Sequence, residues 1–303
     1  RTAAQVERRR VAVGLYALYQ QGNTAFFGVL LADAGLLQNK LLQEELARNY
    51  QRVQACVQYG ISEETDLRVV RVEQLKAEQH ATELAGVRAA CIAILANLTG
   101  MEANETTDFV RPVLLPTVAT SVSRPELSLY DAQIKNYEAE NALVTAGLFP
   151  KFALFATGGY GKPGLNMLEN RFAPYYIVGM KFEWNIGRFY TLKNRRKLIR
   201  NHIGQTEIQR ELFLFNTRLD MIRKNKEIKQ CAEQLKYDDE IIRLKTAIRK
   251  ASEAKMTNGV LSVTELMRDL HAEQMAIQDK IRHEIAYMQA LYDLKFTAGH
   301  TNE

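Results

Sequence analysis

Proline and cysteine are scarce in this 303-residue chain, and their positions limit the fold. All six prolines lie between Pro112 and Pro174, and because proline breaks interior helices, both flanks are free to form long helices. The cysteines, Cys56, Cys91 and Cys231, are odd in number and far apart. This spacing argues against a disulfide framework or a thiolate metal site, and we expect all three to be buried as small apolar residues.

Long hydrophobic runs and an excess of one charge are also lacking. No run approaches the ~18 consecutive apolar residues of a membrane-spanning helix, and the longest helical candidate is the short stretch 25–33. We therefore expect no α-helical integral membrane protein. The 40 basic residues face 35 acidic ones, a net charge of +5 that is spread along the chain and gives little reason to expect a nucleic-acid partner.

Helical periodicity fills both flanks. A helix predicted over 187–256 would extend on the order of 100 Å before Gly259, and a shorter helix returns from about Leu261. The N-terminal flank predicts the same pair, over 2–57 and 65–98. Along the long C-terminal helix, apolar residues alternate steps of four and three, which is typical of a coiled-coil seam: Ile208, Leu212, Phe215, Leu219 and Ile222.

The two flanks are related by an internal repeat. Shifting the chain by 199 residues places Gly60 on Gly259 and Gly100 on Gly299, and it also aligns Leu67 with Leu266. The matches fall on the turn and closing glycines, where geometry constrains the residue type. Residues 101–299 then form one whole unit, and residues 1–100 form the latter half of another.

The middle of the chain differs from both flanks. An irregular stretch over 101–123 precedes a helix predicted from Arg124 to about Leu148. Two strand candidates follow, Lys151–Tyr160 and Ala173–Asn185, joined by a long loop that contains the motif 163–166.

The second strand alternates between an apolar and a polar face. A soluble sheet with one face on a core, or a membrane barrel with lipid outside and a polar lumen, would each explain this pattern. No other strand is predicted, and a lone hairpin is not stable in water, so we favour a barrel shared between subunits. The residues expected to face lipid are Tyr176, Val178, Met180, Phe182 and Trp184, and those expected to face the lumen are Lys181, Glu183 and Asn185.

Several motifs together resemble the second repeat of TolC-type outer-membrane efflux proteins, and the two helical turns resemble that family's periplasmic turns. The likeness covers nearly the whole chain. Its motifs are Arg124–Leu127, Leu148–Pro150, Gly158–Gly161, the loop 163–166, Pro174–Gly179 and Trp184–Asn185, with the turns Tyr59–Leu67 and Asn258–Leu266.

The resemblance implies a mainly α fold with a small β part. Long antiparallel helical hairpins form a coiled-coil tunnel (α-barrel), and one β-hairpin contributes to a trimeric transmembrane β-barrel. The segments would be the first tunnel hairpin (1–100), an equatorial segment and helix (101–149), the outer-membrane hairpin (150–186) and the second tunnel hairpin (187–303). The family's barrel has 12 strands, four per subunit, whereas three copies of this chain supply six.

The resemblance also implies a function, partners and a location. The chain would be a passive conduit of a tripartite efflux or type I secretion system, a homotrimer in the outer membrane of a Gram-negative bacterium with most of the chain in the periplasm. A periplasmic adaptor and an inner-membrane pump would join it. The residues expected to meet the adaptor at the periplasmic mouth are Gly60, Ile61, Asp66, Leu67, Gly259, Val260, Leu261, Glu265 and Leu266.

The sequence motifs do not point to an enzyme, a cofactor or a metal. The glycine-rich stretch 156–162 lacks the first glycine and the Ser or Thr of a phosphate-binding loop. The five histidines have no metal-ligand spacing and are expected in solvated or seam positions, and the charge run Asp238–Glu240 is expected on a solvated helix face. The alternative to a channel is a soluble helical-hairpin scaffold or adaptor protein without membrane insertion.

Overall fold

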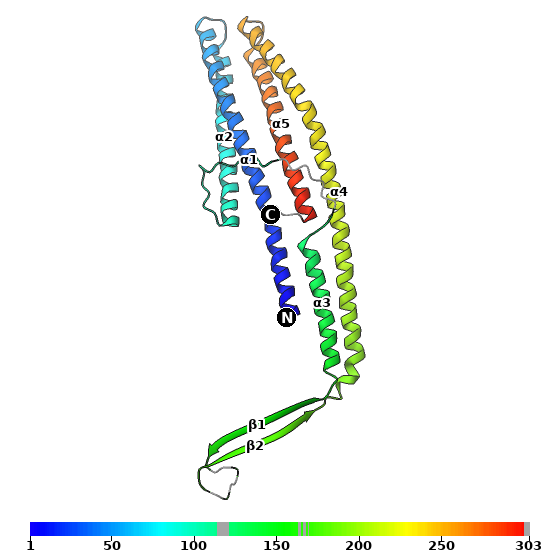
Figure 1. The fold of residues 1–303 in the computed structure, drawn as a ribbon. Helices are drawn as coiled ribbons and strands as arrows, with labels where there is room; N and C mark the ends of the chain where they lie inside the picture. The colour runs from blue at the N-terminus through cyan, green and yellow to red at the C-terminus, as the bar shows by residue number, and fades with distance from the viewer. Residues whose placement is uncertain (114–120, 163–164, 166–167, 169, 300–303) are drawn as a thin grey trace. The chain divides into compact units, whose positions relative to one another are not determined.

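The computed structural model describes residues 1–113, 121–162, 165, 168 and 170–299. Most of the predicted loop motif 163–166 therefore lies outside the described residues. The elements, in chain order, are α1 (Thr2–Gln58), α2 (Glu64–Thr99), α3 (Pro125–Ala146), β1 (Lys151–Gly161), β2 (Ala173–Glu183), α4 (Arg188–Thr257) and α5 (Val263–Ala298) (Figure 1). The predicted mainly α fold with one β-hairpin is confirmed, and most element ends agree within about two residues.

The chain divides into two compact units. One comprises residues 1–11 and 126–213, and the other comprises residues 12–125 and 214–303. The boundaries of these units fall within α1, α3 and α4, so they differ from the boundaries of the four segments expected from the sequence. The four segments remain a prediction. The second unit holds both helical turns and is called the helical unit below.

The internal repeat is visible in the helices of the helical unit. α2 and α5 each have 36 residues, and both of their ends are 199 residues apart in the sequence. The turn glycines Gly60 and Gly259 have φ of 71° and 73°, and the closing glycines Gly100 and Gly299 have 69° and 92°. Among the described residues no others have positive φ. Because a left-handed backbone favours glycine, the sparse sequence identity falls where the turns require it.

The two returning helices also begin with equivalent caps. The carboxylate of Asp66 accepts a hydrogen bond from the Glu63 backbone N–H at 3.3 Å, and Glu265 accepts one from the Ser262 N–H at 3.3 Å. Each pair forms a capping box, which satisfies backbone donors that the first turn of a helix leaves free. The repeat therefore preserves turn geometry and cap chemistry together.

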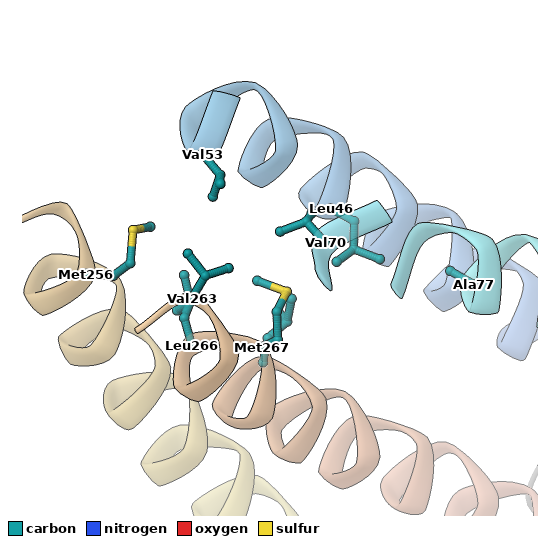
Figure 2. Packing of buried hydrophobic residues seen from close by; sticks show 9 residues of the cluster. Leu46, Val53, Val70, Ala77, Met256, Val263, Leu266 and Met267 are labelled. Carbon is teal, nitrogen blue, oxygen red and sulfur yellow. The ribbon is translucent and has the colours of Figure 1, made fainter. Parts of the chain in front are cut away.

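Near the turns, four helices share one hydrophobic core (Figure 2). Leu46 and Val53 come from α1, Val70 from α2 and Met256 from α4, while α5 contributes the largest share. The side chains of Leu46, Val53, Val70 and Met256 are each at most 4% exposed. Burial of this kind contributes about 1.5–3 kcal/mol per large side chain, so the core ties the first repeat to the second. The α5 members are Val263, Leu266, Met267 and Leu270.

The predicted coiled-coil seam of α4 is exposed rather than covered by another helix of the chain. Its five residues, from Ile208 to Ile222, are between 48% and 67% exposed. The buried positions of α4 include small or polar residues, such as Cys231, Asp238 and Ser252. Within the described part of the chain, α4 therefore leaves this apolar seam, called the α4 stripe below, exposed.

Two further findings concern the apolar runs and the cysteines discussed in the sequence analysis. α1 and α2 each contain an 18-residue window apolar enough to cross a membrane by length and composition, with mean hydropathy of 1.3 and 1.4. Counting consecutive apolar residues missed these windows, because single polar residues interrupt the runs without lowering the mean greatly. Cys231 is buried as expected, whereas Cys56 and Cys91 are only partly buried. All three are free thiols, and burial raises the pKa of Cys91.

The turn geometry yields a matched pair of substitutions. Gly60→Ala should lower the free energy of unfolding by about 1–2 kcal/mol, because alanine resists the left-handed backbone that Gly60 adopts. Gly14→Ala, within α1, should instead raise it by up to about 1 kcal/mol through helix propensity. Neither added Cβ meets an atom within 4 Å, so crowding does not differ. Denaturant unfolding followed by circular dichroism measures both, and equal effects of the two variants would contradict the prediction.

Candidate functional site

The β-hairpin has one face that is apolar on both strands. β1 and β2 pair antiparallel from Lys151 opposite Glu183 to Gly161 opposite Ala173, and directly opposed residues share a face. Phe152 lies opposite Phe182, with ring centroids 5.0 Å apart. This face carries Phe152, Leu154, Ala156 and Gly158 of β1 beside Tyr176, Val178, Met180 and Phe182 of β2.

The opposite face of the hairpin is mixed. Lys181 and Glu183 form an ion pair at 3.6 Å, with both side chains at least 65% exposed. Two aromatic rings on this face lie over glycines of the other strand. A Cβ at Gly179 would come within 2.7 Å of the Phe155 ring, so glycine leaves room for the ring there. The alternation predicted for β2 therefore extends across both strands.

Nothing in the described part of the chain covers the apolar face. Tyr176, Val178 and Met180 are 80%, 70% and 66% exposed, and Phe182 is 54% exposed. The sheet has two strands, so both strands also keep an unpaired edge. A chain that leaves this much apolar surface and hydrogen-bonding capacity open is shaped for association.

Trp184 and Asn185 lie just beyond β2, so the predicted strand was too long by two residues. The indole Nε1 of Trp184 donates a hydrogen bond to the carbonyl of Leu148 at 3.0 Å, and the carbonyl of Asn185 accepts one from the N–H of Arg188. Both residues belong to the connection between the hairpin and its flanking helices. Their predicted lipid and lumen positions remain predictions.

At both helical turns, most residues are exposed. Ile61 is 60% exposed and Val260 is 76% exposed, and each directly follows a turn glycine. Tyr59 beside them is 81% exposed. Among the residues that the structure describes, none covers these aliphatic and aromatic side chains, which makes the turns candidate contact surfaces.

The other predicted mouth residues serve the chain's own fold. Leu266 is 1% exposed within the shared core, and Leu67 and Leu261 pack against that core. Asp66 and Glu265 hold the capping boxes described above. Of these five residues only Leu266 is buried, and Glu265 is exposed. Contact of the predicted mouth residues with an adaptor remains a prediction.

A partly buried ionic cluster joins the two repeats, and the sequence analysis missed it. Arg249 of α4 lies 2.8 Å from Glu45 of α1 and 2.5 Å from Glu273 of α5. Glu253, one turn further along α4, contacts both Arg249, at 3.0 Å, and Arg52 of α1. The Arg249 and Glu273 side chains are 15% and 6% exposed, so water screens these charges weakly. We call these five residues the Arg249 cluster.

Burial dominates the titration of Glu45, a member of this cluster. Desolvation raises the pKa of Glu45 above its usual value, and the positive charge of Arg249 opposes that shift without cancelling it. Glu273 and Glu253 raise the pKa further by like-charge repulsion. The spacing of Arg249 and Glu253 by four residues was the only local signal, because the other partners come from remote helices.

A second polar contact corrects the interpretation of Asp238–Glu240 as a solvated face at Asp238 alone, because Asp239 and Glu240 are exposed. Asp238 is 6% exposed and lies 2.9 Å from Nδ1 of His283. The neighbouring Asp239 is exposed and pairs with Lys280 at 2.6 Å. The residues that the structure describes contain no group of three or more side chains suited to hold a metal ion.

Solved structures provide the comparison with known proteins. The outer-membrane channel OprN matches with a TM-score of 0.80 at 14% identity, covering 99% of this chain and 70% of that chain. The CmeC outer membrane channel of Campylobacter jejuni matches at 0.79 and 12% identity, covering 99% and 67%. The MtrE outer membrane channel of Neisseria gonorrhoeae matches at 0.78 and 16% identity, covering 99% and 70%.

These matches establish the fold. The chain has the fold of TolC-type outer-membrane channels along nearly its whole length, as the sequence resemblance implied. No protein-family model matches the sequence, and neither does any curated protein.

The Arg249 cluster yields the second prediction. Arg249→Met should lower the free energy of unfolding by about 3–5 kcal/mol, because it leaves Glu45 and Glu273 partly buried without their cation. The control is Arg243→Met, also on α4, whose ion pair with Glu240 is exposed and should contribute little. Denaturant unfolding of both variants tests this. Equal destabilisation would mean that the cluster does not hold the repeats together.

Proposed function

We propose that the chain is a subunit of a homotrimeric outer-membrane channel, a passive conduit in a tripartite efflux or type I secretion system and not an enzyme. The exposed apolar face of the β-hairpin carries this proposal. In this view the hairpin lies in the outer membrane of a Gram-negative bacterium, and most of the chain extends into the periplasm.

The hairpin's chemistry favours a shared membrane barrel. In lipid every backbone donor and acceptor must be paired, and strands satisfy this requirement only when a barrel closes. Strands of 11 residues suit a tilted crossing of a bilayer. Pairing of β1 and β2 with strands of other subunits would satisfy their open edges and place the apolar face against lipid.

The α4 stripe favours the trimer. In a trimer with threefold symmetry, each contact between neighbouring subunits joins two different surfaces of the chain. The α4 stripe therefore needs a complementary apolar surface elsewhere on the chain. α1 and α2 offer such a surface, since they carry large apolar residues that are between 48% and 64% exposed. Examples are Val11, Leu15, Leu37 and Leu41 on α1 and Val72, Leu75, Val87 and Ile94 on α2.

The turns favour a partner at the other end of the conduit. Ile61 and Val260 are exposed aliphatic residues at equivalent positions of the repeat, so a trimer would present both in three copies. A periplasmic adaptor that meets these residues would link the channel to an inner-membrane pump. The pump would supply the energy for transport through the passive conduit.

The first test is cysteine scanning along β2 in the assembled protein, after replacement of the three native cysteines. Cysteines on the apolar face should react with an apolar thiol reagent, and those on the mixed face should react with a water-soluble one. Reactivity should therefore alternate with a period of two along the strand. The positions on the apolar face are Tyr176, Val178, Met180 and Phe182, and those on the mixed face are Tyr175, Ile177, Lys181 and Glu183.

The contrary outcome identifies the alternative function. A soluble helical-hairpin scaffold would be recovered without detergent and would react with the water-soluble reagent at every exposed position. The helical unit has its own core, which such a protein would need. Recovery in the outer-membrane fraction with alternating reactivity excludes that alternative.

The turns give a separate prediction. Ile61→Asp and Val260→Asp should each reduce efflux at least tenfold while trimer and outer-membrane levels stay unchanged, because a charge would be buried against the adaptor. The matched control is Val110→Asp, a similarly exposed valine at 80% in the segment after α2. Efflux of a fluorescent substrate from intact cells measures the effect. Normal efflux by the turn variants would make the turns purely structural.

A further inference from the structure

The first turns of α4 carry a local excess of positive charge. Residues 184–206 contain six lysine and arginine residues and no aspartate or glutamate, whereas the whole chain has 40 basic and 35 acidic residues. This stretch directly follows β2, which ends at Glu183. The positive charge therefore gathers beside the hairpin for which we propose a membrane position. Its members are Arg188, Lys193, Arg195, Arg196, Lys197 and Arg200.

The base of the hairpin is fastened to the helices on either side of it. The indole Nε1 of Trp184 donates a hydrogen bond to the Leu148 carbonyl at 3.0 Å, and Arg188 donates one to the Gly147 carbonyl at 3.1 Å. Both acceptors closely follow the end of α3, and Arg188 is the first residue of α4. These bonds hold the first turns of α4 close to the base of the hairpin, as Figure 1 shows.

Two of the other cations turn toward α3. The guanidinium of Arg196 donates a hydrogen bond to Oγ1 of Thr145 at 3.1 Å, and Arg195 lines a small hollow together with Glu140 of α3. Ile199, which lines the same hollow, is 7% exposed. This side of α4 is therefore occupied by α3.

The remaining three cations lie on a different face of α4. Lys193, Lys197 and Arg200 are exposed, and within the described part of the chain none of them forms an ion pair. Tyr190, which is 89% exposed, precedes them, and spacings of three, four and three residues place all four on one side of the helix. We call these four residues the basic face. An aromatic ring beside long cationic side chains is typical of a membrane–water interface.

The basic face lies within reach of a membrane that the hairpin enters. Lys193 and Lys197 lie about 8 and 14 Å along the helix axis from Arg188, and Arg200 lies about 18 Å along it. Helical side chains lean toward the N-terminus of the helix, which here is the end beside the hairpin. A headgroup layer is about 5–8 Å thick, and its surface potential extends about 8 Å further at physiological ionic strength. Both lysines would thus lie in the field of the headgroups, with Arg200 at its edge.

We propose that the basic face binds the headgroup phosphates of anionic phospholipids, such as phosphatidylglycerol, in the leaflet that faces the periplasm. Charge complementarity favours this partner, because three cations without a carboxylate partner meet a surface that carries phosphates. Lysine binds a phosphate as a point charge, and arginine adds a bidentate contact. The inference rests on the proposed channel function and deepens it, since it names the lipid held beside the base of the hairpin.

Energy transfer from tryptophan to a labelled lipid provides the first test. Trp184 is the only tryptophan in the sequence and lies at the base of the hairpin, so it reports on the lipids nearest to the basic face. The full chain is reconstituted into phosphatidylcholine vesicles with a trace of phosphatidylglycerol or phosphatidylcholine that carries the same acyl-chain acceptor. Transfer to phosphatidylglycerol should be about twofold larger. The excess should disappear at about 1 M salt, where the Debye length is about 3 Å. Equal transfer to both lipids at low salt would overturn the proposal.

A matched pair of double variants locates the preference. Lys193→Gln with Lys197→Gln should abolish the excess transfer to phosphatidylglycerol, because the two cations nearest to the headgroups are lost. The control is Lys226→Gln with Lys229→Gln, the same loss of charge at exposed positions farther along α4. The control should keep the full excess. An unchanged lipid preference in the first variant would show that the basic face does not bind the headgroups.

Acetylation of lysines with a water-soluble reagent tests whether lipid is the occupant. In vesicles that contain phosphatidylglycerol, Lys193 and Lys197 should react about threefold more slowly than in pure phosphatidylcholine, because bound phosphates shield them. Lys226 and Lys229 should react equally in both. Slow reaction of Lys193 and Lys197 in both kinds of vesicle would show that another copy of the chain covers the basic face, and would overturn the proposal.

Alkaline extraction of the same vesicles separates this proposal from the channel proposal. A chain that stays in the bilayer after extraction, yet shows no preference for phosphatidylglycerol, would overturn the lipid site and leave the channel function standing. A chain that is fully extracted from both kinds of vesicle would overturn both proposals, because the hairpin would then not lie in the membrane.

Discussion

The apolar core beneath the two helical turns is the interaction on which the rest of the helical unit depends. Glycine turns reverse the chain after α1 and α4, and this reversal brings α2 and α5 back beside their partners. Only then can four helices bury Leu46, Val70, Met256 and Leu266 together. The Arg249 cluster lies on three of these helices. Hydrophobic attraction has no preferred direction, whereas the ion pairs of the cluster fit one register of α1 against α4 and α5.

Long helices cannot bury every apolar side within one such core, and this chain leaves whole surfaces open. α4 places small and polar residues among its buried positions and leaves its apolar stripe in solvent, while the β-hairpin exposes an entire apolar face. Both features carry a cost for an isolated chain in water. The same surfaces would be buried in an assembly that supplies neighbouring helices and strands, so the monomer's exposed area and its proposed function have one physical origin.

The sequence predicted most of the fold because its signals are local. Proline placement, helical periodicity and the turn glycines depend on residues a few positions apart, and they located the helices closely. The side on which a residue lies was harder to predict. Leu266 was expected at a contact surface but is buried, and Asp238 was expected in solvent but meets His283. Both outcomes depend on packing between helices that are remote in sequence, which periodicity within one helix does not describe.

The two repeats share their turns and caps but differ in what they bury between helices. The repeat conserves positive-φ glycines and capping boxes, since these follow from the path of the chain. The shift of 199 residues also relates two buried polar residues, Asp238 and Asn39, but it does not conserve their surroundings. Asp238 pairs with His283, whose equivalent in the first repeat is Leu84. Leucine cannot serve as a polar partner as histidine does. In the first repeat, Leu84 instead packs against Gly35 of α1. Repeated architecture therefore permits one half to close a polar contact within the chain while the other half replaces it with apolar packing.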